Sequence, residues 1–235
     1  MNEVIKIGEK SYKIVDQTVS GFRSSVVFEN GEIVMKLSRY LYGKRRDSVV
    51  DKFRSWAQKK LSKMDCALIL PVYCDGGKVV THNKIYEIYV KRTGGVKTLV
   101  KLVDDFLIEV RIPEDFSDLK SNTVVKDLVE KFIIKDQTRY LKDVVGELNQ
   151  LFFQEQYNIC KFKRTSRRFG SCSSKRNINI AYRLLFAPKG VFRYVCVHEL
   201  AHLKEMNHSK RFWWHVESAM ADYKESEKWL RESGF

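Results

Sequence analysis

The sequence has little that would place it in a membrane or outside the cell. No stretch approaches the roughly 20 apolar residues that span a bilayer, and the longest apolar segment, from Cys66 to Cys74, is short and contains Pro71. The N-terminus has no basic region followed by an apolar one, so a secretory signal is not expected. The five cysteines are odd in number and include no C-x-x-C pair, which argues against a disulfide framework and against a four-cysteine zinc site. We therefore expect a cytoplasmic protein with reduced cysteines.

Proline and glycine are also scarce. Three prolines and twelve glycines in 235 residues leave little room for a flexible linker. The 44% of hydrophobic and 31% of charged residues indicate a folded globular chain rather than a disordered one. The length allows one large domain or two small ones, and no internal repeat is evident.

Positive charge is abundant and unevenly placed. The formal net charge is +14, and residues 161–193 contain ten lysines and arginines without a single acidic residue. A solvated basic face is one explanation for such a stretch. The other is a polyanionic partner, nucleic acid above all.

The first 115 residues are predicted to be rich in β-strands. Short apolar or alternating segments are separated by glycine-containing turn signals, and a basic helix is predicted over about 46–63. The strands are predicted at 12–15, 25–28, 33–35, 78–80, 85–90, 98–100 and 107–110. Asn30-Gly31 predicts a hairpin turn before the third of these strands.

The pattern becomes helical at residue 121. Apolar residues then recur at helical spacing to about residue 157, which predicts one long helix or two. The candidate N-caps of this region are Ser121, Asn122 and Thr123. The later predicted elements are strands at 159–163 and 178–182, a helix from Pro188 to about Met206 and a helix capped by Ser209. We predict an α+β fold with a β-rich N-terminal region, 1–115, and a helical domain with a small mixed sheet, 116–235.

Histidine is concentrated in one part of this helical domain. Four of the five histidines are His198, His202, His208 and His215. His198 and His202 are spaced i, i+4, so on a helix both can bind one metal ion, and Glu199 can reach a metal-bound water without being a ligand. The alternative is an ordinary amphipathic helix with surface histidines. Against it, Leu200 and Leu203 lie on a different helix face, which leaves the histidines free for a cleft.

A catalytic zinc site needs a third protein ligand besides these two histidines. His208 is the first candidate, because Asn207 tolerates a left-handed backbone and can end the helix so that the chain returns. Glu217 is the second candidate, and it could instead act as a hydrogen-bond partner of a ligand histidine. Zn²⁺ is therefore the expected cofactor.

These residues resemble the YgjP-like family of zinc metallopeptidases, relatives of the SprT-like and WLM proteases. The matching segments, in family order and spacing, are 168–173, 177–179, 183–188, 194–202 and 207–213. Phe169 stands where the family usually has tryptophan.

The resemblance implies His198, His202 and His208 as zinc ligands and Glu199 as the general base. It also implies a zincin-like architecture, with a mixed sheet packed over the active-site helix, and a protein or peptide substrate. The SprT-like and WLM relatives act on proteins bound to DNA, so by analogy the stretch 161–193 would meet DNA.

On this interpretation Glu199 takes a proton from a zinc-acidified water that attacks a carbonyl, and later gives it to the leaving amine. The candidates for a donor to the oxyanion are His215, Tyr194, Tyr223 and Arg168. The strand at 178–182 is expected to be the cleft edge that pairs with an extended peptide. Cys172 is expected to be a buried, inert thiol, although it could approach the zinc. Of the adjacent Trp213 and Trp214, only one can face the core.

Two other functions fit parts of the pattern. One is a nucleic-acid-binding protein with a non-catalytic zinc site, but such a site needs no base and usually closes with a fourth ligand, often cysteine, of which none is suitably spaced. The other is a metal-dependent hydrolase of a non-peptide amide or ester.

Overall fold

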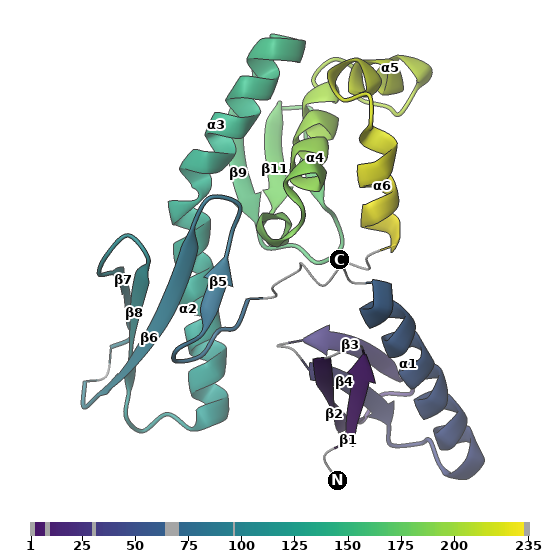
Figure 1. Ribbon diagram of the computed structural model, residues 1–235, viewed down its shortest axis with the longest axis vertical. Helices are drawn as coiled ribbons and strands as arrows, with labels where there is room; N and C mark the ends of the chain where they lie inside the picture. Colours follow the sequence, from purple (N-terminus) through teal and green to yellow (C-terminus); the bar gives the residue numbers. More distant parts are fainter. Residues whose placement is uncertain (1–2, 8–9, 30–31, 64–70, 96, 233–235) are drawn as a thin grey trace. The chain divides into compact units, whose positions relative to one another are not determined.

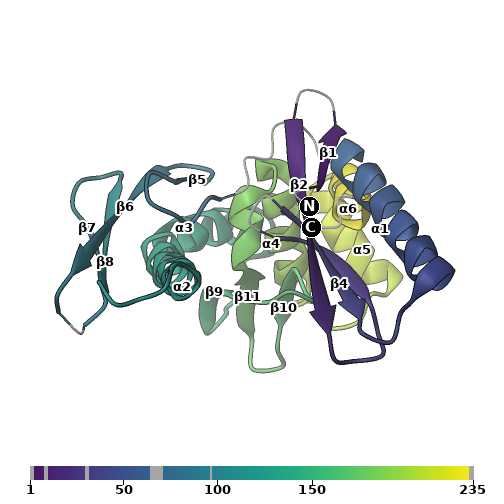
Figure 2. The same ribbon diagram turned by 90° about the horizontal axis from the view of Figure 1, so that it is seen from below.

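The computed structural model describes residues 3–7, 10–29, 32–63, 71–95 and 97–232 (Figures 1 and 2). The chain divides into two compact units, Met1–Val72 with Glu232–Phe235, and Tyr73–Arg231. The boundary drawn from the sequence, after residue 115, lies inside the second unit. The strands before that position pack against the helix that follows it, so they belong to the unit that carries the histidines.

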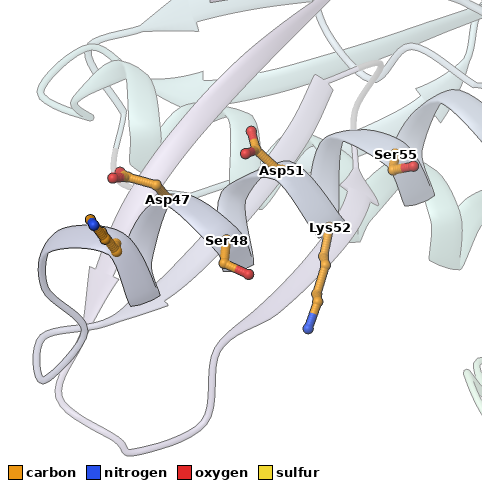
Figure 3. A pocket seen from close by; sticks show the side chains of 6 residues that line it. Asp47, Ser48, Asp51, Lys52 and Ser55 are labelled. Atoms are coloured by element: carbon orange, nitrogen blue, oxygen red, sulfur yellow. The ribbon is translucent and has the colours of Figure 1, made fainter.

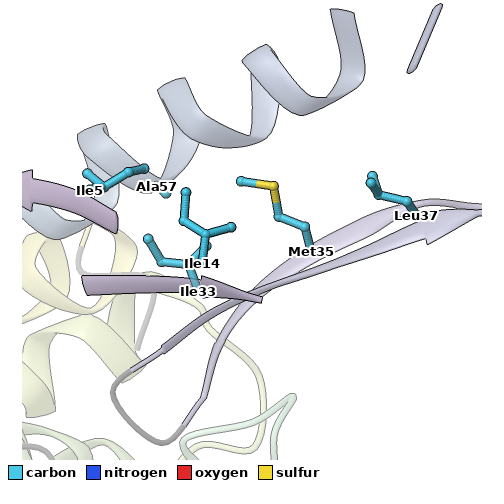
Figure 4. Close-up of a cluster of buried hydrophobic side chains, with 6 residues drawn as sticks. All are labelled: Ile5, Ile14, Ile33, Met35, Leu37 and Ala57. Carbon is cyan, nitrogen blue, oxygen red and sulfur yellow. The ribbon is translucent and has the colours of Figure 1, made fainter. Parts of the chain in front are cut away.

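The N-terminal unit is a four-stranded sheet with one helix packed on it. Its elements are β1 (Glu3–Ile7), β2 (Lys10–Val19), β3 (Ser25–Glu29), β4 (Glu32–Ser38) and α1 (Gly43–Lys63). The strand order is β1-β2-β4-β3, with β2 and β4 parallel and the two outer pairs antiparallel. The buried side chains between sheet and helix are Ile5, Ile14, Ile33, Met35, Leu37 and Ala57 (Figure 4). The β3–β4 pair agrees with the predicted hairpin, whose turn residues Asn30 and Gly31 lie outside the described residues.

The same arrangement of four strands and a helix recurs at the start of the second unit. Its elements are β5 (Lys78–Val80), β6 (Ile85–Thr93), β7 (Leu99–Leu102), β8 (Leu107–Pro113) and α2 (Asp118–Asp136). The order β5-β6-β8-β7 again has a parallel central pair between antiparallel outer pairs. Ile14 pairs with Ile33 in the first sheet and Ile88 with Ile108 in the second, and all four are buried. The fold thus contains a structural repeat that is not evident in the sequence.

The predicted long helical region consists of two helices. These are α2 and α3 (Thr138–Leu148), which meet at Gln137. The N-cap of α2 is Ser117, whose hydroxyl accepts a hydrogen bond from the Lys120 backbone N–H. The predicted caps at 121–123 were therefore wrong. Ser121 is buried in the helix, which begins earlier than the apolar spacing suggests.

The remaining elements form a small mixed sheet with helices. They are η1 (Asn149–Phe153), β9 (Ile159–Lys163), β10 (Gly170–Cys172), β11 (Asn177–Ala181), η2 (Tyr182–Phe186), α4 (Lys189–Ala201), α5 (Lys210–Ala219) and α6 (Tyr223–Glu232). In the order β10-β11-β9, β10 is antiparallel and β9 parallel to β11. Helix α4 contacts β10, β11, α3 and α5. The predicted α+β fold with a small mixed sheet is confirmed.

The edge of this sheet differs from the prediction. The segment 178–182 was expected to form the cleft edge, but β11, which includes residues 178–181 of it, is the central strand, and β10 lies at an edge among the described residues. The sequence did not indicate β10, because three residues are too few for a strand pattern. None of the helices in the described part of the chain combines the length and apolar character of a membrane span.

Candidate metal centre

Helix α4 fixes the position of the first two histidines. Its N-cap is Pro188, and most of its side chains are buried against the sheet and the neighbouring helices. The helix ends at the second histidine, because His202 is its C-cap. The N–H groups of Lys204 and Glu205 both donate to the Ala201 carbonyl, each at 3.0 Å, which satisfies one of the carbonyl groups at the C-terminal end of the helix.

After α4 the chain folds back so that His208 lies beside this helix, and Asn207 does not have a left-handed backbone conformation. The described non-glycine residues with positive φ are Gln154 and Arg176, so the predicted role of Asn207 was wrong. Asn207 acts through its side chain instead, because its Oδ1 accepts the Ser209 N–H at 3.0 Å. The Ser209 hydroxyl accepts the Phe212 N–H at 3.4 Å, which confirms Ser209 as the N-cap of α5.

Together these turns place His208 beside His198 and His202. Candidate ligand atoms of the three side chains all lie within 4.8 Å of one another, and the Nε2 atoms of His198 and His208 are 3.1 Å apart. Two imidazole ligands at 2.0–2.1 Å from one tetrahedral zinc would be about 3.3 Å apart. The Nδ1 of His202 lies 3.2 Å from the Glu205 carbonyl and can donate to it, which leaves Nε2 free for a metal. The donor set therefore fits zinc.

Phe212 supports all three imidazole rings. Its side chain is fully buried, and its ring centroid lies 4.9 Å from that of His198, 4.6 Å from His202 and 4.7 Å from His208. No functional role was predicted for Phe212 from the sequence. Its spacing four residues after His208, at the start of a helix, was the available signal.

Burial favours the neutral form of His198 and His202. Burial, with smaller contributions from the other two histidines, lowers the pKa of His198 to about 3. Burial also lowers the pKa of His202. A neutral imidazole offers a lone pair to a cation, so this environment suits metal binding.

Glu199 lies buried beside the cluster, on the same helix. Its side chain is 4% exposed, its Oε2 has no hydrogen-bond partner, and burial raises the pKa of its carboxyl group to about 8. The carboxyl group faces Gly170 at the start of β10, where an added Cβ would be 2.7 Å from Glu199 Cδ. An orphaned buried oxygen of this kind calls for a partner that the protein itself does not supply.

The other predicted residues are Glu217 as a third metal ligand and four candidate donors to the oxyanion, and they differ in their contacts with the histidine cluster. Glu217 is exposed and does not belong to the group of potential metal ligands found among the described residues. Tyr194 is buried with its ring edge-on to His198, at 6.0 Å between centroids, and it stacks on Tyr223 at 6.2 Å. His215 contacts the ring of Trp214, and Arg168 is exposed. Among the four donor candidates, the two tyrosines therefore have ring contacts that lead to the cluster.

Cys172 and the tryptophan pair lie near the same site. Cys172 is half-buried rather than buried, and burial together with the nearby Glu199 raises the pKa of its thiol to about 11, which keeps it protonated. Trp213 stacks on Tyr223 at 5.5 Å and lies 6.0 Å from His208, whereas Trp214 is 63% exposed. The expectation that only one tryptophan faces inward agrees with this arrangement.

The basic stretch 161–193 is partly neutralised by acidic residues from other segments. Three of its arginines form ion pairs with carboxylates that precede it in the chain: Arg164 with Asp127 and Glu130, Arg176 with Glu155, and Arg193 with Glu147. The side chains of Lys161 and Lys163 alternate with buried ones along β9 and are exposed, and no carboxylate in the described part of the chain pairs with them. The free positive charge of the stretch is therefore smaller than its sequence indicates.

A separate hollow lies on the surface of α1 (Figure 3). The residues that line it are Lys44, Asp47, Ser48, Asp51, Lys52 and Ser55. All six follow one face of a single helix, and their two positive and two negative charges balance. It belongs to the N-terminal unit, which contains none of the clustered histidines.

Comparisons with known proteins indicate the family of the chain. The family model described as "YgjP-like, metallopeptidase domain" matches residues 24–233. No curated protein matches the chain. Among solved structures, the metallopeptidase zymogen of Methanocaldococcus jannaschii jannalysin is 22% identical over 40% of this chain and 97% of its own, with a TM-score of 0.36. The metallopeptidase zymogen of Pyrococcus abyssi abylysin is 22% identical over 42% of this chain and 93% of its own, with a TM-score of 0.31.

Proposed function

Because the chain belongs to the YgjP-like metallopeptidase family, we propose that it hydrolyses peptide bonds at a zinc ion held by His198, His202 and His208, with Glu199 as the general base. A metallopeptidase is a hydrolase that uses a metal ion and takes a protein or peptide as its substrate. The family match shows a metallopeptidase. The identity of the metal ion, of its ligands and of the general base is what we propose.

The convergence of three imidazole side chains is the observation that carries this proposal. Their candidate ligand atoms lie within 4.8 Å of one another, and imidazole nitrogen is a preferred ligand of zinc. His208 is exposed and the other two histidines are half-buried, so the cluster is accessible to a substrate. When bound, zinc supplies a Lewis acid and an acidified water.

Glu199 is the residue that accepts and donates the proton in the proposed reaction. Its side chain lies on α4 between the first two histidines in sequence, and its buried Oε2 has no protein partner. The carboxylate accepts the proton that the attacking water loses, and it donates that proton to the amine that leaves. Tyr194 and Tyr223 are the donor candidates that the ring contacts favour for the oxyanion.

The extended substrate would pair with β10. This strand lies at the edge of the three-stranded sheet, contacts α4, and begins at the residue that faces Glu199. Backbone hydrogen bonds to an open edge bind a peptide with little dependence on its side chains. A strand in this position would align the scissile bond with Glu199.

We further propose that the substrates include nucleic-acid-associated proteins in the cytoplasm. The exposed Lys161 and Lys163 supply positive charge that no described carboxylate neutralises. Four cysteines of the described chain are free, which suits a reducing compartment, and Cys66 lies outside the described residues.

The test of the proposed function combines metal analysis with the variant Glu199→Gln. Purified protein should contain about one zinc per chain, and His202→Ala should lose it. Glu199→Gln should retain the zinc and lose turnover of a mixture of internally quenched peptides. Retained turnover would refute the role of Glu199, and a zinc-free protein after reconstitution would refute the site.

The variant Glu199→Gln also distinguishes the proposed peptidase from two alternative functions. A nucleic-acid-binding protein with a non-catalytic zinc would show no turnover in the wild type and unchanged zinc and DNA binding in Glu199→Gln. A hydrolase of non-peptide substrates would lose its turnover of ester or amide probes in Glu199→Gln while cleaving no peptide. The match to a metallopeptidase family favours a peptide substrate over a non-peptide ester or amide.

A further inference from the structure

We infer that Gly170 is a positioning residue for Glu199, because the absence of a side chain at 170 leaves the space that the Glu199 carboxyl group occupies. This inference rests on the proposed role of Glu199 as the general base. The two residues belong to different elements, since Gly170 is the first residue of β10 and Glu199 lies in α4.

The space between these residues is smaller than a methyl group. A Cβ added to Gly170 would be 2.7 Å from both Cγ and Cδ of Glu199, and it would also overlap Oε1. Non-bonded carbon atoms are stable at about 3.5–4.0 Å. An alanine at 170 therefore requires one of the two groups to move.

The backbone does not require glycine at this position. The described glycines with positive φ are Gly43 and Gly76, so Gly170 has a conformation open to residues with a side chain. At the other glycines for which this distance is known, an added Cβ would meet no atom closer than 3.9 Å; these are Gly21, Gly43, Gly76, Gly94, Gly95, Gly146 and Gly190. The available reason for glycine at 170 is therefore the room that it leaves for Glu199.

The group that would move is the carboxyl group. Gly170 is held in the sheet by its pairing with Ile180 in β11, whereas the Glu199 side chain can rotate. A displacement of about 1 Å in a reacting group can lower a rate about 10²-fold. Gly170→Ala should consequently impair the proton transfer and leave the three histidines in place.

The first test compares Gly170→Ala with Gly190→Ala in the full-length chain. Gly190 lies in the first turn of α4, where an added Cβ would meet only the Ser226 hydroxyl at 4.0 Å. With internally quenched peptides, Gly170→Ala should lower kcat about 10²-fold with KM and zinc content unchanged. Gly190→Ala should match the wild type in all three.

A thermal double-mutant cycle tests the contact without an activity assay. Gly170→Ala should lower the melting temperature of the wild type, but not that of Glu199→Ala, in which the opposing side chain is gone. An equal decrease in both backgrounds would overturn the inference, because it would locate the requirement for glycine in the backbone.

The two proposals fail in distinguishable ways. If Glu199→Gln is inactive and Gly170→Ala retains the wild-type kcat, the positioning role is refuted and the base is not. If Glu199→Gln remains active, the proposed function is refuted, and the thermal cycle alone decides whether Gly170 makes room for Glu199.

Discussion

The Nε2 atoms of His198 and His208 lie 3.1 Å apart although the residues are ten positions apart in the chain. The end of α4, the turn after it and the Ser209 cap of α5 produce this proximity. Two nitrogen lone pairs at this distance repel each other unless a proton or a cation lies between them. Metal binding should therefore stabilise the folded protein directly.

Zinc should raise the melting temperature of the metal-free wild type and not that of His208→Ala. Zinc at 100 times its dissociation constant contributes about 2.7 kcal/mol to the free energy of unfolding if it binds only the folded state. His215→Ala is the matched control, because this histidine lies in α5 outside the cluster. Differential scanning calorimetry with and without zinc measures the effect, and an equal response of His208→Ala and wild type would contradict it.

Phe212→Leu should weaken zinc binding as well as stability. The Phe212 ring contacts all three imidazoles, so a smaller side chain lets them reorient. Loss of a hydrogen-bond partner that orients a ligand lowers metal affinity about 10–100-fold in other sites, and the loss expected here is at most of that size. The free energy of unfolding should fall by about 1–3 kcal/mol.

Phe162→Leu in β9 serves as the control for Phe212→Leu. Phe162 is buried, and its described ring contact is with Phe192 rather than with a histidine. Competition with a zinc-binding dye should give the wild-type affinity for Phe162→Leu. Equal affinities in the two variants would show that Phe212 contributes packing alone.

The sequence predicted the parts of the site that depend on local geometry. The i, i+4 spacing of His198 and His202 and the Ser209 cap are properties of single helices, and the structure has both helices. Gly170 was missed as a partner of Glu199, because their contact joins a three-residue strand to a helix about thirty residues later in the chain. No periodicity within either segment reports such a contact.

The ion pairs that neutralise part of the basic stretch 161–193 could not be predicted from the sequence either. Arg164, Arg176 and Arg193 appear unpaired in the sequence because each carboxylate partner precedes its arginine by more than 20 residues. The strand repeat was also not evident, since it is defined by strand order and register rather than by similar residues. Both features depend on tertiary pairing.

Glu155 should make stability depend on pH below neutrality. A hydrogen bond from Arg176, and a weaker contribution from Lys204, holds the pKa of Glu155 below its usual range. A carboxylate with a lowered pKa in the folded state stabilises the protein above its unfolded pKa of about 4.3, and this contribution is lost as the pH falls through the folded value.

Glu155→Gln should therefore be less stable than the wild type at pH 7, and the difference should vanish in acid. Urea unfolding at both pH values measures it. Glu147→Gln is the control, because the carboxylate that pairs with Arg193 is 52% exposed against 29% for Glu155, so its loss should matter less. A difference for Glu155→Gln that persists below pH 3 would contradict the ion-pair explanation.

The exposed lysines of β9 are expected to contribute to the salt dependence of DNA binding. Each phosphate contact adds about 0.9 to the slope of log affinity against log salt for duplex DNA. The double variant Lys161→Gln/Lys163→Gln should therefore lower the slope for a short labelled duplex by about 2, whereas Arg193→Gln should leave it nearly unchanged because that arginine is paired with Glu147.

Fluorescence anisotropy between about 50 and 200 mM salt measures both slopes. If the double variant keeps the wild-type slope, β9 does not meet phosphate. If the wild type does not bind the duplex even at low salt, the remaining charge of 161–193 is a solvated face, and peptide pairing at β10 must account for substrate recognition without DNA. A lower slope in the double variant alone would place DNA at β9, the edge of the three-stranded sheet that lies opposite β10.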